Sequence, residues 1–326
     1  MSGGAVPRTT PTPGRAVPAV FVGVATLDAL ALVDRYPDAD ERVIAGDVRF
    51  AGGGPAATAA VAAARLGLPV AFVGAVGADH EGTEILDGLA REGVDVSGVE
   101  IATDAASAMT VVLADRRRQT RAIAARPGPP LALTGHGAEL VRHAEWVHVD
   151  HGGWFPVAAL LRESSRRSRL SVDAGNPIDD FHPRGVDLYV PTVTSLRARY
   201  GEDLDEDRLL DNALNDGARA VIATDGGNGA IGADAGGRFR VPAYRADIVS
   251  TLGAGDVFHG ALVAGVVLGL RLEDATRLAT TTAALSCRAL DGRSAIPTAD
   301  ELDPHLPDLT LSTRARRARR HDPVHM

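Results

Sequence analysis

Short, fully apolar runs alternate along this chain with amphipathic or alanine-rich stretches. Apolar runs that end at a glycine or a carboxylate indicate strands that are buried on both faces of a sheet. The stretches between them carry apolar residues at helical spacing and close on a glycine, as in GGGPAATAAVAAARLG (52–67) and HEGTEILDGLAREG (80–93). The first buried strand is expected within residues 19–30, where it ends at Gly23 with Asp28 just beyond it. The other buried strands are expected within residues 70–77, 144–150, 170–175, 187–192 and 218–224.

This alternation of strands and helices predicts an α/β fold, a doubly wound, mostly parallel sheet with helices on both faces. Two segments do not fit that sheet, because they alternate in polarity or carry charge and no helix follows them. Residues 42–50 read as one strand, and residues 107–125 read as two strands joined by a charged hairpin. We therefore predict a small β-sheet lid, built from about residues 36–52 and 106–127.

The two ends of the chain differ in composition from this domain, which we place at residues 18–305. Residues 1–17 are rich in Pro, Thr and Gly and lack the apolar core of a signal peptide, so a disordered arm is expected. Residues 306–326 are basic and show no helical periodicity. A disordered, solvated tail is expected there, with a weak anion-binding arm as the alternative.

Composition excludes several classes of function. The formal net charge of −8 argues against a nucleic-acid-binding protein, and no apolar run is long enough for a membrane helix. The single cysteine, Cys287, rules out a disulfide framework, so we expect a cytoplasmic protein in which Cys287 is a buried apolar residue. The chain has no lysine, which excludes the P-loop, protein-kinase and Schiff-base chemistries that require one.

The strongest chemical signal is STLGAGDVFHGAL (250–262), in which glycines stand directly before Asp256 and an apolar helix. Glycines permit a turn whose amides point into one concavity, and a helix N-terminus adds unpaired amides and a partial positive charge. Residues 252–256 are therefore expected to form an anion hole for a phosphoryl group in transfer. Asp256, kept ionised by the helix dipole, would accept the proton of the attacking hydroxyl. A lone motif of this kind fits a helix-capping aspartate equally well.

Five segments, in order, resemble signatures of the PfkB/ribokinase family of sugar kinases. TLGAGDVFHGA (251–261) resembles the family's D-T-x-G-A-G-D-x-F signature, and GGPAATAAVAAARLG (53–67) resembles its N-terminal signature. VGVATLD (22–28), VGAVGAD (73–79) and ATDGGNGA (223–230) resemble its first-strand, G-x-V-G-x-D and T-x-G-x-x-G segments.

The resemblance covers residues 19–303 and implies a ribokinase-like fold that transfers the γ-phosphoryl group of ATP to a sugar hydroxyl. It implies Asp256 as the catalytic base and an anion hole formed by Gly253, Ala254 and Gly255. Carried over by position, the sugar-binding residues would be Asp28, Gly53, Gly54 and Thr58, and the ATP-binding residues would be Thr224, Gly226 and Gly229. Without the other motifs, Asp28 and the ATP-binding segment would fit ordinary turns at strand ends.

Three positions depart from the family pattern. Ser250 replaces the aspartate that often helps to hold a monovalent cation, so activation by such a cation is doubtful. Thr58 replaces a usual asparagine. The family's N-x-x-E, which places Mg²⁺ through water, has no clear match, and the aligned stretch is PTVTS (191–195). Mg²⁺ is still expected, because it arrives with ATP, but its protein ligands are not identified.

The sequence leaves the sugar open. Residues 52–67 and 253–262 resemble the family's sulfofructose kinases, which phosphorylate 6-deoxy-6-sulfofructose at its 1-hydroxyl. An anionic sugar needs a cationic partner, for which Arg42 is the first candidate and Arg121 or Arg126 the next; a solvated lid charge is the equal alternative for Arg42.

The remaining alternatives are a kinase for an unmodified ketose, a pentose or a sugar phosphate, a nucleoside kinase, and a catalytically silent sugar- or nucleotide-binding regulator. A dinucleotide-binding oxidoreductase fits poorly, because no G-x-G-x-x-G follows the first strand. The expected partners are a sugar, ATP and a second copy of the chain bound through the lid, and neither nucleic acid nor a membrane.

Overall fold

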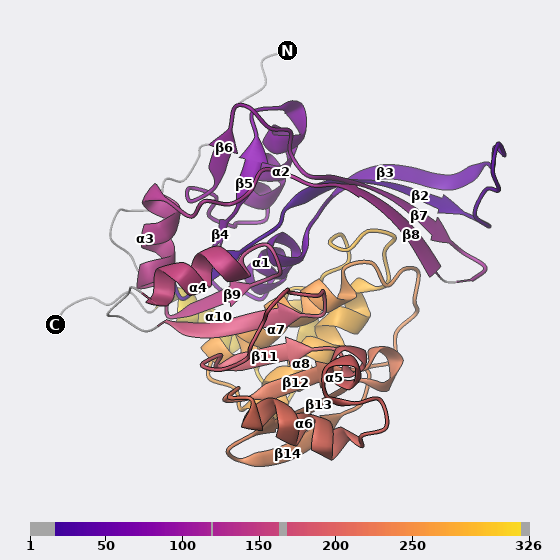
Figure 1. Ribbon diagram of the computed structural model, residues 1–326. Coiled ribbons are helices and arrows are strands. Elements are labelled where there is room, and N and C mark those ends of the chain that lie inside the picture. The colour runs from indigo at the N-terminus through magenta and orange to yellow at the C-terminus, as the bar shows by residue number, and fades with distance from the viewer. Residues whose placement is uncertain (1–16, 119, 163–167, 321–326) are drawn as a thin grey trace.

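The structure is a computed structural model that describes residues 17–118, 120–162 and 168–320, and it has an α/β body from which a second sheet projects (Figure 1). Among these residues the main sheet has eight strands in the order β14-β13-β12-β11-β10-β9-β1-β4. Neighbouring strands are parallel except where β13 pairs with β12 and β14. The strands are β1 (Ala19–Val22), β4 (Val70–Val73), β9 (Trp146–Val149), β10 (Arg169–Ala174), β11 (Leu188–Pro191), β12 (Val221–Thr224), β13 (Ala230–Asp234) and β14 (Gly237–Val241). The predicted doubly wound, mostly parallel sheet is confirmed.

Helices cover both faces of this sheet, because successive strand residues point to opposite sides. Ala19 and Phe21 pack into one core cluster, and Val20 and Val22 pack into the other. The first cluster holds α1 (Pro55–Arg65), α2 (His80–Arg91), α7 (Ala254–Val267), α8 (Leu272–Ser286) and α9 (Ala299–Leu302). The second holds α3 (Gly135–His143), α4 (Trp154–Arg162), α5 (Val193–Tyr200) and α6 (Glu206–Asn215).

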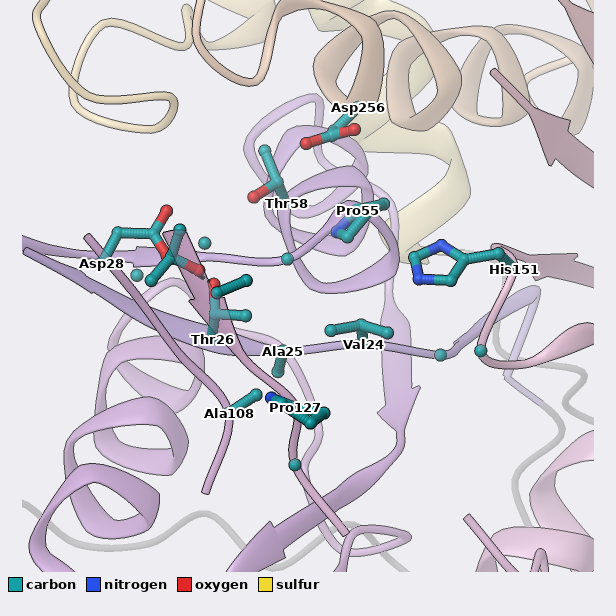
Figure 2. Close-up of a pocket in the computed structure, with 18 of the residues that line it drawn as sticks. Val24, Ala25, Thr26, Asp28, Pro55, Thr58, Ala108, Pro127, His151 and Asp256 are labelled. Carbon is teal, nitrogen blue, oxygen red and sulfur yellow. Dashed lines mark hydrogen bonds between the residues drawn. The ribbon is translucent and has the colours of Figure 1, made fainter. Parts of the chain in front are cut away.

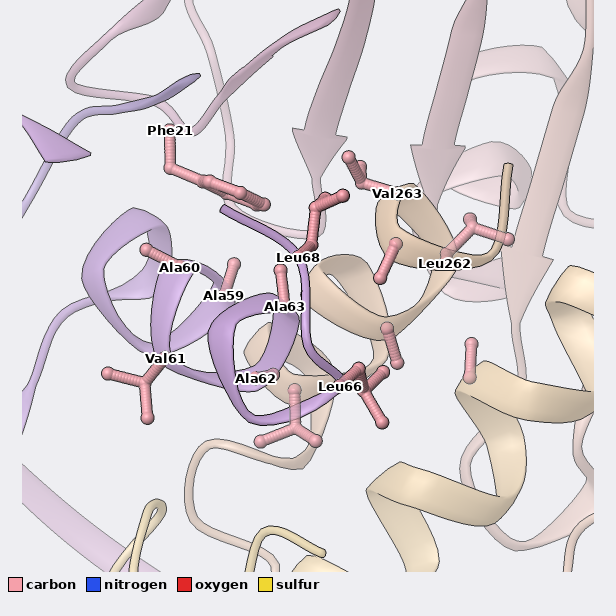
Figure 3. Close-up of a cluster of buried hydrophobic side chains, with 14 of the residues drawn as sticks. Phe21, Ala59, Ala60, Val61, Ala62, Ala63, Leu66, Leu68, Leu262 and Val263 are labelled. Atoms are coloured by element: carbon pink, nitrogen blue, oxygen red, sulfur yellow. The ribbon is translucent and has the colours of Figure 1, made fainter. Parts of the chain in front are cut away.

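Small residues let α1 and α7 lie in direct contact (Figure 3). The buried face of α1 is mostly alanine, and a Cβ atom added to Gly260 of α7 would lie 2.0 Å from the carbonyl oxygen of Ala59. A larger residue at either place would separate the helices. Their N-termini therefore meet at one edge of the body, and this contact positions the candidate site.

The predicted lid is a four-stranded sheet in the order β3-β2-β7-β8, and it projects from the body (Figure 1). Three strands match the prediction, namely β3 (Ala45–Gly53), β7 (Met109–Asp115) and β8 (Thr120–Arg126). The fourth, β2 (Thr26–Val33), was not predicted as a separate strand, since the first buried strand was expected to end at Gly23 with Asp28 just beyond it. The chain leaves the main sheet near Gly23, as expected, but it continues directly into the lid, and Asp28 therefore lies in a lid strand. A separate pair, β5 (Ala75–Gly77) and β6 (Glu100–Ala102), forms a two-stranded parallel sheet.

The C-terminal segment contains a helix, α10 (Leu311–Arg320), where a disordered tail was predicted. Leu311 and Ala315 lie on one side of it and are buried in the core cluster of α1 and α7, and Arg314 donates to the carbonyl oxygens of Leu309 and Leu268. The sequence did not reveal this helix, because two apolar positions among many arginines give no recognisable helical periodicity. The predicted N-terminal arm lies almost wholly outside the described residues, as do residues 321–326.

None of the helices in the described ranges is both long and apolar enough to span a membrane. Cys287 is buried as predicted, and burial raises the pKa of its thiol.

Candidate active site

A cavity of about 650 Å³ lies where the lid meets the carboxyl ends of β1 and β9 and the N-termini of α1 and α7 (Figure 2). The lid contributes Asp28 and Thr110, and α1 contributes Thr58. Gly253 and Asp256 line it from the start of α7, and His151 lines it from the segment after β9. The N-terminal and C-terminal signatures, nearly 200 residues apart in the printed sequence, thus line the same cavity.

The N-terminus of α7 has the geometry of an anion-binding turn. Gly253 precedes the helix with φ of 72°, in the left-handed region, and a Cβ atom there would lie 3.0 Å from Cα of Gly292. A Cβ atom on Gly255 would meet no atom within 4 Å, so this side of the turn is open. Within the described ranges, the amides of Gly255 and Asp256 donate to no protein acceptor. Open, unpaired amides at a helix N-terminus suit a phosphoryl group.

Asp256 lies in the first turn of α7 and is partly buried. Burial, reinforced by the carboxylate of Asp173, raises its pKa to about 7, although nearby His259 and Arg293 favour the ionised form. Burial and the Asp173 carboxylate therefore oppose the ionised state that the helix dipole was expected to favour. A carboxyl that titrates near neutrality can both accept and release a proton under physiological conditions.

Asp28 forms the opposite, polar end of the cavity (Figure 2). Its carboxylate accepts from Thr26 Oγ1 at 2.6 Å. Burial raises the pKa of Asp28, while the Thr26 and Thr110 hydroxyls and the Arg293 guanidinium oppose that rise. A Cβ atom on Gly53 would lie 2.1 Å from Asp28 Oδ2, so only glycine lets this backbone pass the carboxylate. The predicted sugar-binding residues of β2, β3 and α1 are thus brought together.

Arg293 is a site residue that sequence reasoning missed. Its Nε donates to Thr58 Oγ1 at 3.1 Å, and a terminal nitrogen donates to the carbonyl oxygen of Gly53 at 2.6 Å. Burial lowers the pKa of Arg293 to about 10, and the carboxylates of Asp28 and Asp256 keep it from falling further. The Arg293 guanidinium therefore interacts electrostatically with both Asp28 and Asp256. It stands in DGRSAIPT (291–298), which carries no recognisable local signal.

Asp150 was also missed, and it is wholly buried. Its Oδ2 accepts from the amides of Val24 at 2.8 Å and Ala56 at 3.1 Å, and its Oδ1 accepts from Gly152 at 2.8 Å and Gly153 at 3.1 Å. One carboxylate therefore ties together the segment after β1, the start of α1 and the segment after β9, all of which line the cavity.

The arginines named from sequence lie in different places. Arg42 is exposed, precedes β3 and does not line the cavity, because β3 runs from the lid's outer end toward the cavity at Gly53. Arg126 lines the cavity and donates to the carbonyl oxygen of Ser107 at 2.9 Å. Arg121 donates to Thr251 Oγ1 at 3.0 Å, which links the lid to the segment before α7.

The predicted ATP-binding segment lies apart from this cavity, at the carboxyl end of β12. Thr224 ends that strand, a short 3₁₀ turn (Gly226–Asn228) follows, and Gly229 has φ of 101°. Gly229 also approaches the backbone closely, since a Cβ atom would lie 2.1 Å from the carbonyl oxygen of Val241. Within the described ranges, no group of three or more His, Cys, Asp or Glu side chains could hold a metal ion.

Comparisons with known proteins agree with this architecture. Residues 19–299 match the family model described as pfkB family carbohydrate kinase. The ribokinase of Lactococcus lactis is 25% identical over 299 residues, covering 89% of this chain and 97% of that protein. The ATP-dependent ribose-1-phosphate kinase of Halopiger xanaduensis is 29% identical over 276 residues, covering 84% and 92%.

Solved structures show the same fold. A putative ribokinase from Agrobacterium tumefaciens superposes with a TM-score of 0.77 at 26% identity, covering 94% of this chain and all of that one. The ribokinase of Arabidopsis thaliana complexed with ribose and ATP gives a TM-score of 0.76 at 23% identity, covering 91% and 99%. The open glycine turn at the start of α7, the paired signatures and the family match over most of the length lead to one conclusion: this chain belongs to the pfkB family of carbohydrate kinases and is an ATP-dependent phosphotransferase that acts on a sugar hydroxyl.

Proposed function

We propose that the sugar binds between Asp28 and Asp256, and that Asp256 accepts the proton of the hydroxyl that attacks the γ-phosphoryl group of ATP. The observation that carries this proposal is the position of Asp256, which lines the sugar cavity beside the unpaired amides of the α7 N-terminus. A general base must reach the hydroxyl, and the developing phosphoryl charge needs donors next to it.

The polar groups of the cavity suit sugar hydroxyls. Asp28 offers carboxylate oxygens for a pair of neighbouring hydroxyls, and Thr58 and the backbone at Gly53–Gly54 add further partners. ATP would extend from the α7 N-terminus toward Thr224, Gly226 and Gly229, and Mg²⁺ would come with the nucleotide. The absence of a carboxylate cluster among the described residues fits a metal held mainly by phosphates and water.

A small unmodified sugar is the substrate class that this geometry supports best, because the sugar-binding end presents carboxylate, hydroxyl and backbone groups. By their names, one of the relatives is a ribokinase, which fits this class, and another is a kinase for ribose 1-phosphate, which is an anionic sugar. An anionic sugar such as sulfofructose is the second candidate. Its support is Arg126, a cation on the cavity wall whose guanidinium is only partly engaged by Ser107.

The outer face of the lid supports a homodimer. Val48, Phe50 and Val111 are 68%, 67% and 49% exposed. Phe50 and Val111 both lie opposite Ala29 in the strand register, so they share one face, whereas Thr110 and Val112 on the alternate face line the cavity. An apolar sheet face of this kind is costly to leave in water. A second copy of the lid is the occupant that we propose.

A panel of sugars tests the proposed function, with ADP release measured in the presence of ATP and Mg²⁺. The panel should contain ribose, fructose, ribose 1-phosphate and 6-deoxy-6-sulfofructose. We expect one of these to support turnover, and Asp256→Asn to lower kcat at least about 100-fold while ATP binding is kept. Turnover by Asp256→Asn within a few-fold of the parent would refute the assignment of the base.

A further inference from the structure

A buried ion pair lies directly beneath Asp256. Nε2 of His259 is 3.1 Å from Oδ1 of Asp173, and both side chains are 6% exposed. His259 follows Asp256 by three residues in α7, which places the two side chains on the same side of the helix. Asp173 comes from β10 and also accepts from the amide of Gly175 at 2.8 Å. The pair does not line the sugar cavity.

Charged and titratable groups from several elements surround Asp256 and this pair. They are Asp173 on β10, His259 on α7, Asp150 after β9, Arg293 after α8, and His148 on β9. His148 lies against His259, with ring centroids 5.4 Å apart, and its Nδ1 is 3.0 Å from Ser171 Oγ. Burial, with the positive charge of His259, lowers the pKa of His148 to about 3, so this second imidazole is neutral.

The two members of the pair depend on each other for their charge. Burial disfavours a charged imidazole, but the carboxylate of Asp173, together with those of Asp256 and Asp150, outweighs that effect and raises the pKa of His259. Asp173 in turn has a pKa lowered to about 2, because His259 and the amide of Gly175 outweigh the effect of burial. Without His259, the carboxylates of Asp173 and Asp150 would both repel a negative charge on Asp256, and Arg293 would be the cation left to oppose them.

We propose that the buried His259–Asp173 pair is a charge-compensating element that lets Asp256 ionise at neutral pH. The pair contributes no net charge while both members are present, and it leaves an uncompensated anion beneath the base if only the histidine is removed. His259 is thus a positioning residue, which acts on the reaction only through Asp256. This inference rests on the proposed role of Asp256 as the base.

The decisive comparison is between His259→Gln and the double variant Asp173→Asn/His259→Gln. The single variant leaves one anion and should move the acid limb of kcat about 1 pH unit higher, the lower end of the range for a charge this near. If the pKa rises from about 7 to about 8, kcat at pH 7 falls about fivefold and recovers at high pH. The double variant removes both charges, so its acid limb should return to within a few tenths of a unit of the parent's.

His148→Gln is the matched control, because it removes a neutral imidazole from the same buried cluster. Its acid limb should stay in place even if its melting temperature falls. Asp173→Asn alone is a second test should His259→Gln fail to fold. Removing this anion must leave the pKa of Asp256 unchanged or lower it.

The ionisation of Asp256 can also be read without turnover, by carbon-13 NMR of labelled aspartate carboxyls, with Asp256→Asn identifying the signal. An upward shift in His259→Gln that disappears in the double variant supports the inference even if no tested sugar is phosphorylated, a result that would count against the proposed function alone. The inference is overturned if the Asp256 signal titrates at the same pH in His259→Gln and in the parent, if the double variant fails to restore it, or if Asp173→Asn raises it.

Discussion

Replacing Asp150 by Asn tests whether one buried carboxylate holds the site segments in place. The change keeps the size of the side chain but turns one oxygen into an NH₂ group that can only donate. Whichever orientation the amide adopts, two backbone amides then face a donor. If the oxygen stays with Gly152 and Gly153, the amides of Val24 and Ala56 lose their acceptor.

The size of the effect follows from those bonds. A hydrogen bond to a charged group contributes about 1.5–3 kcal/mol, so losing two costs about 3–6 kcal/mol of unfolding free energy. Typical domains have only about 5–15 kcal/mol in total. Because Asp150 has no exposed surface, water cannot take the place of the lost acceptor. We therefore expect Asp150→Asn to be the least stable single Asp→Asn variant of the site.

Urea unfolding, followed by circular dichroism, measures this free energy. Asp234→Asn is the matched control, since the Asp234 carboxylate accepts one hydrogen bond at the surface, from the amide of Gly236 at 2.7 Å. This variant should lose less than about 1 kcal/mol of unfolding free energy. The reasoning is refuted if Asp150→Asn stays within about 1 kcal/mol of the parent. In that case relaxation or water must satisfy the two amides.

Three further outcomes are expected. Gly253→Ala places an alanine in the left-handed conformation and should lower the free energy of unfolding by about 1–2 kcal/mol. It should also disturb the turn that is proposed to bind the phosphoryl group, so kcat should fall at least about tenfold. An unchanged kcat would mean that the reaction does not use this turn. Saturating sugar should slow hydrogen exchange in β7 and β8, because lid residues line the cavity, and unchanged exchange would argue against a lid that closes over the sugar. Phe50→Lys should shift sedimentation from dimer to monomer, whereas a parent protein that is itself monomeric would exclude the proposed lid interface.

The sequence predicted the main sheet because buried parallel strands are short apolar runs, and each such run can be recognised without knowing its partners. It placed three of the four lid strands for the opposite reason, since polarity alternates in them. The β2 strand was not predicted, because Thr26 and Asp28 interrupt the apolar residues after Gly23 and the segment therefore resembles the chain beyond a strand end. Arg42 was assigned to the sugar because the direction of β3 relative to the cavity cannot be read from its residues.

Within the site, the residues that the sequence indicated differ from those it missed in how far along the chain their partners lie. Asp256 could be proposed from the chemistry of its neighbours in sequence, and Asp28 from the resemblance of VGVATLD (22–28) to a family segment. Asp150, Arg293 and the His259–Asp173 pair were not, because they act on partners that are remote in the chain. Asp150 binds amides 94 and 126 residues away, and Arg293 binds Thr58 and Gly53, 235 and 240 residues away.

These remote contacts are buried, whereas the groups proposed to contact the sugar and the phosphoryl group line the cavity. The motif residues therefore indicate which reaction the cavity can perform. The buried carboxylates, the histidine and the arginine determine at which pH, and with how rigid a geometry, it can do so. Substitutions in this second set should alter pH profiles and stability before they alter the choice of sugar.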